Sequence, residues 1–572
     1  MKKRNKFFDR FGASRGIRNT TAATCCLIAC VACWVPTNAK AQNHRDDRIH
    51  DHFETRMIWR RNRPKPNRDQ PLTNHMQRFH SFDGSFNNLQ RTSWGVAGSR
   101  LLRLAPPAYS DGISEPARID EVSPRLISNE MFDQRQSIPD AQGLSSMVWQ
   151  WGQFIDHDLD LTETSETLEP FPILVPAGDP WFDPAGTGSQ FIMLLRSAYA
   201  FNTGVDQPRE QVNFITSWLD GSMVYGSDED TANSLRHFRK GMLKVSASPF
   251  GHLLPADEDG FFLAGDIRVN EQVCLTAMHT LFMREHNRIC RELLRQNPDL
   301  TDDQLYFNAR ERVIATIQSI TYNEFLPAIL GSGAIPPYSG YQPNVFPNVS
   351  NEFSTAAYRF GHSMLNSELW RMDSAGESLP SGAIRLSEAF FNPDEVREHG
   401  IDPLMMGLCL QRAQAIDNKV VDDVRNFLFG PPGAGGFDLV SLNVQRGRDH
   451  GLPDINRIRQ QFGLPPHRDF MDLTSDVATQ IQLHELYGDV KNVDPWVAML
   501  CEDHFPGAAV GETAWFVIRD QFLRLRDGDR FWYENRFSPQ AVQNFNNTRL
   551  SNVVRRNTGL KALPIDMFHV GN

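Results

Sequence analysis

Cysteine is scarce in this sequence, and none of it is spaced for metal binding. The 572 residues include 8 Cys, four of which lie near the N-terminus, at Cys25, Cys26, Cys30 and Cys33. The others, Cys274, Cys290, Cys409 and Cys501, show no CxxC spacing. On one helix, Cys274 and Cys290 would lie ~24 Å apart, whereas a disulfide needs α-carbons within ~7 Å. A disulfide scaffold is therefore excluded, and the pairing of the other cysteines stays open.

Long hydrophobic runs are also missing. A membrane-spanning helix needs ~20 apolar residues, and the run "TAATCCLIACVACWVP" is shorter. It follows a basic start and precedes "NAKA", which predicts a signal peptide over residues 1–41, cleaved after Ala41. "LIAC" resembles a lipoprotein box, but too few apolar residues precede it. We therefore expect a secreted, extracellular protein, or a periplasmic one if bacterial, without stable membrane insertion.

An excess of basic residues is absent as well. The formal net charge is −11. Without the leader's eight bases and one acid, 50 Lys and Arg face 68 Asp and Glu, a net of −18. This acidic balance argues against nucleic acid as a partner. The basic stretch "RMIWRRNRPKPNR" lies in a polar, His-rich lead-in, residues 42–80, which we interpret as a flexible tail. A surface-binding arm is the alternative.

Alternating strand patterns are rare, and helical patterns dominate what is present. "TDDQLYFNARERVIATIQSITYNEFLPAIL" opens with Thr301 and Gln304 at capping-box spacing and predicts a helix ending near Pro327. "VNEQVCLTAMHTLFMREHNRICRELLRQN" and "GETAWFVIRDQFLRLRDGDRFWYEN" predict two further long helices. Residues 81–572 are expected to form one large, mainly α domain with very little β. A cofactor at its centre would help explain the coherence of so large a domain.

The segment "WGQFIDHDLD" places charge in an apolar, aromatic setting. On a helix, Gln153, Asp156 and His157 share one face, whereas Asp158 points about 100° away. An exposed acidic stripe would be the ordinary explanation, but the flanking aromatic residues make a wholly exposed helix improbable. The pattern therefore predicts two sites, one on each face.

A second polar cluster lies in "TSWLDGSMVYGSDED", where Thr216, Trp218, Asp220 and Ser222 recur at every second position. In an extended loop these residues can direct oxygens to one cation, and Ca²⁺ prefers such ligands. Asp158 could complete the set. Taken alone, the loop is more often a plain turn than a metal site.

Three further motifs carry polar residues of uncertain role when each is considered alone. Arg268 and Glu271 in "AGDIRVNEQ" are three apart at a helix start, where a structural ion pair is the default interpretation. His362 lies in the apolar "AAYRFGHSML" and would ordinarily be a satisfied core histidine. Polar groups crowd the motif "SLNVQRGRDHG", at Asn443, Arg446, Arg448 and Asp449.

Seven motifs together, in this order, give the chain a recognisable pattern: "WGQFIDHDLD", "DGSMVYGS", "AGDIRVNEQ", "HTLFMREHNRI", "YRFGHS", "LNVQRGRDHG" and "LRDGDRFWYEN". The chain resembles the animal haem peroxidase family from about Phe79 to Leu560. The resemblance implies a mainly α, cyclooxygenase-like fold of helices around a central haem.

The resemblance also implies roles for individual residues. His157 matches the distal catalytic histidine, with Gln153 beside it, and Arg268 the distal arginine. His362 matches the proximal ligand of the haem iron, and Asn443 the residue that accepts its hydrogen bond. Asp156 and Glu271 match acids that bind a haem b derivative through ester bonds, and Arg359 and Arg446 lie near its propionates. The residues that match calcium ligands are Asp158, Thr216, Trp218 (by its carbonyl), Asp220 and Ser222.

The reaction implied by the resemblance begins with hydrogen peroxide and proceeds through a ferryl intermediate. That intermediate oxidises a small anionic or phenolic donor: a halide, thiocyanate or phenol. Some relatives have a Met after the ester-forming Glu, and its sulfonium link raises the oxidising power of the haem. Gln272 stands there in this chain, so we expect bromide or iodide rather than chloride as the halide.

Three alternatives are weaker. Haem-dependent fatty-acid dioxygenases place a radical-forming Tyr three residues before the proximal His, where this chain has Arg359, with Tyr358 one residue earlier. An adhesion protein on a peroxidase fold would not need His157 and the other intact motifs. A metallohydrolase using His279 and His286 would lack the HExxH pattern.

Overall fold

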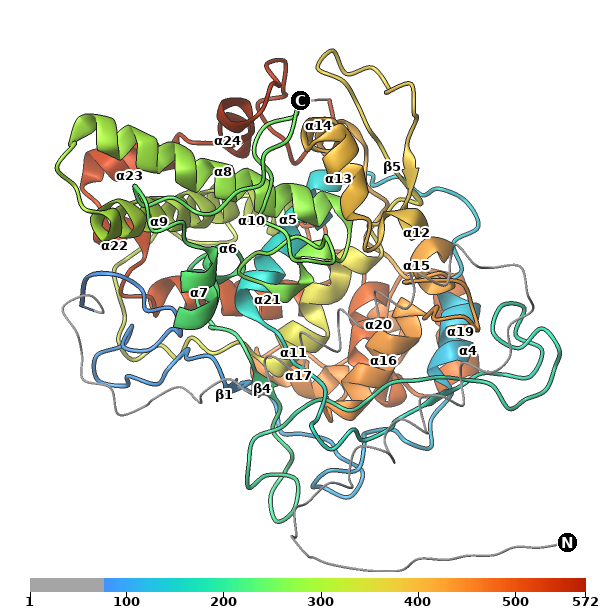
Figure 1. Ribbon diagram of the computed structural model, residues 1–572. Coiled ribbons are helices and arrows are strands. Elements are labelled where there is room, and N and C mark those ends of the chain that lie inside the picture. Colours follow the sequence, from blue (N-terminus) through green and yellow to red (C-terminus); the bar gives the residue numbers. More distant parts are fainter. Residues whose placement is uncertain (1–76, 572) are drawn as a thin grey trace, which may run out of the picture. The chain divides into compact units, whose positions relative to one another are not determined.

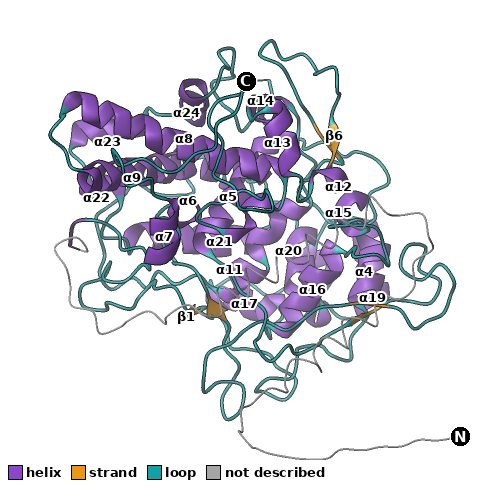
Figure 2. Cartoon of the chain, in the orientation of Figure 1, coloured by secondary structure: helices purple, strands orange, loops and turns teal. Residues whose placement is uncertain are grey.

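The computed structural model describes residues 77–571, which form a mainly helical domain (Figures 1 and 2). The predicted signal peptide and nearly all of the predicted tail lie outside the described residues. The α-helices are α4 (Pro124–Met131), α5 (Ser146–Leu159), α6 (Ser222–Tyr225), α7 (Glu229–Leu235), α8 (Val273–Gln296), α9 (Asp302–Ile320), α10 (Leu326–Leu330), α11 (Asn351–Thr355), α12 (Leu386–Ala389), α13 (Pro393–His399), α14 (Asp402–Leu410), α15 (Asp422–Arg425), α16 (Leu439–Asp449), α17 (Ile455–Gln461), α18 (Phe470–Leu473), α19 (Val477–Tyr487), α20 (Pro495–Cys501), α21 (Glu512–Asp527), α22 (Tyr533–Arg536), α23 (Pro539–Asn546) and α24 (Leu550–Asn557).

Strand structure in residues 77–571 is limited to three two-stranded antiparallel ladders. Strand β1 (Ser99–Arg100) pairs with β4 (Val212–Asn213), β2 (Ile173–Leu174) with β3 (Phe191–Ile192), and β5 (Glu368–Leu369) with β6 (Ile384–Arg385). The prediction of a mainly α fold with very little β is confirmed.

Helix α9 begins where the sequence predicted. The Thr301 hydroxyl accepts from the backbone N–H of Gln304, whose side chain accepts from the backbone N–H of Thr301. The predicted end near Pro327 is wrong by a few residues. A π-helical segment, η2 (Thr321–Phe325), follows α9, and Pro327 lies in the first turn of α10, where a proline needs no amide donor.

The core surrounds α5 and α8, which pack on each other, while α8 also packs along α9 (Figure 1). Trp151 and Phe154 of α5 contact Phe282 of α8, with ring centroids 5.8 and 5.1 Å away. Both helices are buried over most of their length. Aromatic packing therefore fixes the depth and rotation of α5, the helix that carries the Gln153–Asp158 cluster.

Three short 3-10 segments complete the helical structure: η1 (Ile267–Asn270), η3 (Ala357–His362) and η4 (Val490–Asn492). Segments η1 and η3 matter most for the site, because they hold Arg268 and His362. Helix α5 packs against η3, and a Cβ placed on Gly361 would lie 3.8 Å from the Cβ of Trp149. The motifs that contain Arg268 and His362, which are far from α5 in the sequence, therefore lie close to α5 in the fold.

The four cysteines within residues 77–571 are free and buried: Cys274, Cys290, Cys409 and Cys501. Cys274 and Cys290 both lie on α8, about four turns apart, in agreement with the distance argument. Among the described helices, none combines the length and the apolarity that crossing a bilayer demands.

Candidate functional site

His157 lies near the end of α5 with its ring almost fully buried. Its Nε2 is 3.8 Å from Glu271 Oε2, and its Nδ1 is 3.9 Å from Asp266 Oδ1. Both distances exceed those of a hydrogen bond, and Nδ1 has no hydrogen-bond partner. Burial, with a smaller effect from the Arg268 cation, holds the pKa of His157 well below its ordinary value. The imidazole is therefore neutral near pH 7 and able to accept a proton.

Arg268 is held in place by Asp266, two residues earlier. Its Nε and Nη2 donate to the two carboxylate oxygens at 2.8 and 3.0 Å, and Nη2 also donates to the carbonyl of Asp160. Its Nη1 lies 3.7 Å from Asp156 Oδ2. The simple Arg268–Glu271 ion pair considered from the sequence is replaced by this Asp266 clamp. The result is a fixed cation beside His157.

Besides Asp266, two further carboxylic acids lie beside this pair: Asp156, 3.7 Å from Arg268, and Glu271, 3.8 Å from His157. Their side chains retain 28% and 27% exposure, respectively. Burial, followed by the repulsion of Asp160, raises the pKa of Asp156 well above its ordinary value. Burial raises the pKa of Glu271 to about 7. Two carboxyl groups with raised pKa values thus lie beside the Arg268–His157 pair.

His362 ends η3, and its Nδ1 lies 2.7 Å from Asn443 Nδ2 on α16. Asn443 Oδ1 accepts from Arg359 Nη1 at 2.9 Å. The pairing of His362 with Asn443 matches the expectation, but the amide presents its donor to the ring because Arg359 occupies the oxygen. Burial and the Arg359 cation lower the pKa of His362 to about 3, so this imidazole is also neutral.

Arg446 lies on α16, one turn beyond Asn443. Its Nη1 donates to the Leu195 carbonyl, the Ser197 hydroxyl and Asp449 Oδ2 at 2.7–3.0 Å. Arg359 Nε donates to the Ser354 carbonyl at 2.9 Å. Both residues are only partly buried, and these hydrogen bonds fix the position of each guanidinium group.

Asp158 points away from His157, as the helical geometry predicted, and is fully buried. Its Oδ1 accepts from the Ser222 hydroxyl at 2.7 Å and its Oδ2 from the Gly221 N–H at 3.0 Å. Gly221 adopts φ 74°, a left-handed conformation that favours glycine, as it caps α6. The charge of the "DHD" tripeptide is therefore divided between two faces.

Asp220 is buried beside Asp158. Its Oδ1 accepts from the Thr216 hydroxyl and the Ser222 N–H, whereas its Oδ2 has no hydrogen-bond partner. Burial and the neighbouring Asp158 raise the pKa of Asp220 well above its ordinary value. The segment bends instead of running extended, so the residues converge by turning and not by the alternation expected. Trp218 is buried, with its indole N–H on the Gly84 carbonyl.

Backbone contacts join the cluster around Asp158 and Asp220 to the loop that carries Arg268. The N–H of Asp266 donates to the Met223 carbonyl at 3.1 Å. A Cβ on Gly265 would lie 2.2 Å from the Ser222 carbonyl, so only glycine permits this approach. The loop that carries Arg268 is thus seated directly on α6, the element that begins at Ser222.

Sequence reasoning missed two residues of the site. Asp266 clamps Arg268, and its spacing two residues earlier in "AGDIR", as the cap of η1, was the available signal. Gln150 shares the α5 face of Gln153, and both amide oxygens accept from Gln272 Nε2, at 2.6 and 3.0 Å. Gln272 therefore tethers the start of α8 to α5.

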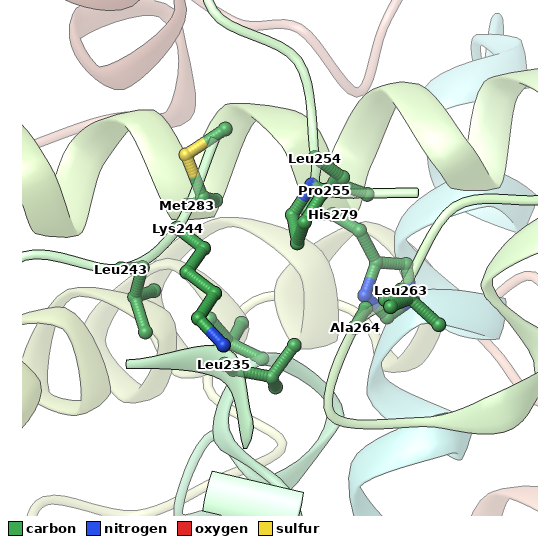
Figure 3. A pocket seen from close by; sticks show the side chains of 10 residues that line it. Leu235, Leu243, Lys244, Leu254, Pro255, Leu263, Ala264, His279 and Met283 are labelled. Carbon is green, nitrogen blue, oxygen red and sulfur yellow. The ribbon is translucent and has the colours of Figure 1, made fainter. Parts of the chain in front are cut away.

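The histidines of the metallohydrolase alternative have structural surroundings. His286 bonds to the Tyr225 hydroxyl and the Gly241 carbonyl, each at 2.9 Å. His279 lines a small, mostly apolar pocket together with Leu263 and Met283 (Figure 3). Neither arrangement resembles a zinc ligand set.

The adhesion and dioxygenase alternatives gain no support from the geometry. The sequence contains no RGD tripeptide, and "LRDGD" is the segment that could be mistaken for one. Its Asp529 is buried and bonds to His80 and Asn87, so it offers no exposed adhesive loop. Tyr358 is buried within η3, stacked on Phe353, and its hydroxyl has no hydrogen-bond partner.

Comparisons with known proteins agree with this geometry. The family profile described as "Animal haem peroxidase" matches residues 79–568. Peroxinectin A of Dictyostelium discoideum is 37% identical over 505 residues, covering 84% of this chain and 94% of the relative. A peroxidasin homolog of Mus musculus is 35% identical over 86% of this chain, which spans 38% of that relative's length.

Solved structures show the same similarity. Peroxidase A from Dictyostelium discoideum aligns with a TM-score of 0.80 and 35% identity, over 86% of this chain and 99% of its own. A fatty acid alpha-dioxygenase of Arabidopsis thaliana aligns at 0.75 with 22% identity, over 86% and 84% of the two chains. The second likeness concerns the fold alone.

Proposed function

This chain belongs to the animal haem peroxidase family and is a haem peroxidase, and we propose that it is secreted and oxidises bromide, iodide, thiocyanate or phenols. Membership of this family implies hydrogen peroxide and an electron donor as substrates. The single observation that carries the residue assignment is the convergence of His157, Arg268 and the η3 histidine His362 on helix α5.

The residues present fit a haem. His362 is a neutral imidazole, and within residues 77–571 its Nε2 has no hydrogen-bond partner, so it can bind iron. Iron binding requires the tautomer with hydrogen on Nδ1. A half-turn of the Asn443 amide would then present its oxygen as acceptor. Arg359 and Arg446 carry the positive charge that suits the propionates.

When bound, the haem supplies the redox centre that reduces peroxide. His157 takes the first proton of hydrogen peroxide and returns it to the departing oxygen, since it is buried, neutral and without a hydrogen-bond partner at Nδ1. Arg268 stabilises the negative charge that develops on that oxygen. The Asp266 clamp holds the guanidinium in place before the reaction, which is the condition for effective electrostatic stabilisation.

Asp156 and Glu271 are the proposed ester-forming acids. Each carboxyl is partly accessible and has a raised pKa, and each lies within 4 Å of the Arg268–His157 pair. Covalent attachment from two sides would fix the ring between α5 and η1. Gln153 has a supporting role, because its amide is held by Gln272.

Calcium is the proposed partner of Asp158 and Asp220. Two adjacent buried carboxylates repel each other, and Asp220 Oδ2 lacks any hydrogen bond, which is costly for a buried polar atom. A hard cation would neutralise both. Thr216, Ser222 and the Trp218 carbonyl supply further oxygens of the type Ca²⁺ prefers.

Absorption spectroscopy tests the proposal directly. Purified full-length protein reconstituted with haem should show a Soret band that shifts when hydrogen peroxide is added. It should then return to its resting position on adding iodide or a phenol. A protein that takes up no haem, or whose Soret band ignores peroxide, would overturn the assignment.

A further inference from the structure

A column of aromatic side chains leads away from η3. Tyr358, four residues before His362, has its ring centroid 5.8 Å from Phe522 on α21. Phe522 is 5.9 Å from Tyr322 in η2, and Tyr322 is 4.7 Å from Trp532. These separations are those of aromatic rings in direct contact. All four rings are buried, so the column is continuous and excludes water.

The outer end of the column reaches the protein surface. Trp532 directly precedes α22, a helix that packs against α9 (Figure 1). Its ring lies 6.1 Å from that of Tyr338, in the loop between α10 and α11. Tyr338 is half-buried, although its hydroxyl oxygen is covered. One end of the column thus borders the haem-binding segment, and the other lies against a residue that is only partly covered.

Trp532 differs from the other tryptophans of residues 77–571 in its hydrogen bond. Its indole N–H donates to the Glu534 carboxylate at 3.2 Å. The other bonded indoles donate to hydroxyl or carbonyl oxygens: Trp151 to Thr321, Trp218 to Gly84, Trp496 to Arg359 and Trp515 to Leu330. A carboxylate can accept a proton, whereas these oxygens cannot hold one near neutral pH. Among the tryptophans that the structure describes, only Trp532 donates its indole N–H to a carboxylate.

The tyrosines of the column lack such a base. The hydroxyl of Tyr358 has no hydrogen-bond partner, and that of Tyr322 donates to the Phe522 carbonyl. Loss of an electron makes a phenol or an indole much more acidic than before, so the oxidised state settles where the proton can leave. Within the column that place is Trp532.

We propose that Trp532 is a second oxidation site, which serves phenolic donors too large to enter the haem cavity. The inference rests on the proposed haem beside His362. One electron passes from Trp532 through the column to the oxidised haem, the indole N–H bond breaks, and the proton moves to Glu534. The neutral indole radical then takes an electron from a phenol at Tyr338. Glu534 returns its proton to the indole nitrogen, and the phenol releases its own proton to water as a phenoxyl radical forms.

Radical trapping tests the site itself. Haem-loaded protein is treated with peroxide and a nitroso spin trap, without donor, and the adduct is located by peptide mapping. The adduct is expected on the Trp532 peptide in the parent and in the control Trp515→Phe, whose indole faces a carbonyl. It should fall to the peroxide-free level in Trp532→Phe. Equal labelling in Trp532→Phe and the parent would overturn the proposal.

Glu534→Gln keeps the ring and removes the base, which separates the proposal from a packing effect. Freeze-quench electron paramagnetic resonance of the parent should show a neutral tryptophan radical. In Glu534→Gln that signal should be lost or replaced by the protonated cation. An identical neutral-radical signal in both proteins would refute the role of Glu534.

The donor test compares free phenol with phenol linked to a high-molecular-mass dextran. Trp532→Phe should lose turnover of the dextran-linked phenol and retain that of free phenol, which also shows that the variant is folded. Equal turnover of the linked phenol in variant and parent refutes the second site alone. A parent that oxidises neither donor refutes the proposed function and this inference with it.

Discussion

At the residue scale, His157 is the group on which peroxide reactivity should depend most. His157→Ala removes the proposed proton acceptor but leaves His362 to bind haem. General acid–base groups typically contribute ~10²–10⁴-fold in rate, and a loss of that size is expected in stopped-flow reaction with peroxide. The Soret band before peroxide serves as the control for haem binding. A variant that reacts as fast as the parent would remove His157 from the mechanism.

The two acids proposed to form esters give a second residue-scale prediction. Haem in peroxide-treated parent should resist extraction by acidified organic solvent, because Asp156 and Glu271 are each proposed to bind it covalently. The double variant Asp156→Val, Glu271→Val should release all of it, and each single variant should keep one link. The measurement is the haem fraction remaining with the protein, followed by mass spectrometry. Full extraction from the parent would count against both links.

How far the sequence predicted the site is clearest from individual residues. The division of Asp156, His157 and Asp158 between two faces followed from helical geometry, because α5 is regular and capped. The Asp266 clamp was not predicted, since pairing across two residues in a 3-10 segment has no strong periodic signal. The orientation of the Asn443 amide depends on Arg359, far away in sequence, and no local pattern encodes it.

At the scale of elements, the proposed calcium loop and the Arg268 loop form one unit. Asp158 anchors α6 through Ser222, and α6 in turn seats Asp266. Asp158→Ala should therefore disturb Arg268 as well as the cation. We expect lower haem retention and a lower unfolding temperature, with chelator causing the same change in the parent. Removing one member of a buried ion pair lowers the free energy of unfolding by ~3–5 kcal/mol, and Asp158 with the proposed calcium would be such a pair.

Elemental analysis provides the matching measurement. The purified parent should contain close to one equivalent of calcium, and Asp158→Ala should contain far less. Gly265→Ala is the companion variant: it removes no proposed ligand side chain, but its Cβ would collide with the Ser222 carbonyl. It should lose peroxide reactivity while keeping more calcium than Asp158→Ala. Absence of calcium from the parent would exclude the cation site.

Element boundaries were harder to predict than element identity. Thr301 fixed the start of α9 because a capping box is a local, two-bond signal. The end was misplaced because the helix passes through the π segment η2 and restarts at Leu326, where Pro327 fits the first turn. Tertiary packing of Phe325 and its neighbours outweighed the helix-ending tendency of proline.

At the scale of the whole molecule, the sequence predicted a mainly helical fold from its periodicity and one large domain from the order of its motifs. It did not predict the three short ladders, because two-residue strands leave too little alternation to detect. The distances between motifs could not be predicted from the sequence either. Arg268 and Asp160 are 108 positions apart, yet they are hydrogen-bonded. Such contacts arise because α5 and η1 both pack against α8, an arrangement that only the folded chain specifies.

The last prediction concerns the electron donor that the enzyme oxidises. A Met after the ester-forming acid would add a conjugated positive charge to the haem, and nearby charge is one of the ways a protein sets redox potential. Here Gln272 occupies that position. Its Nε2 donates to the amide oxygens of Gln150 and Gln153, and its Oε1 accepts from the backbone N–H of Cys274 at the start of α8. Chloride is the hardest of these halides to oxidise, so we expect turnover of bromide, iodide and thiocyanate with little of chloride. Steady-state halogenation of a reporter at neutral pH, one halide at a time, measures this. Chloride turnover equal to that of bromide would show that another feature of the site raises the potential.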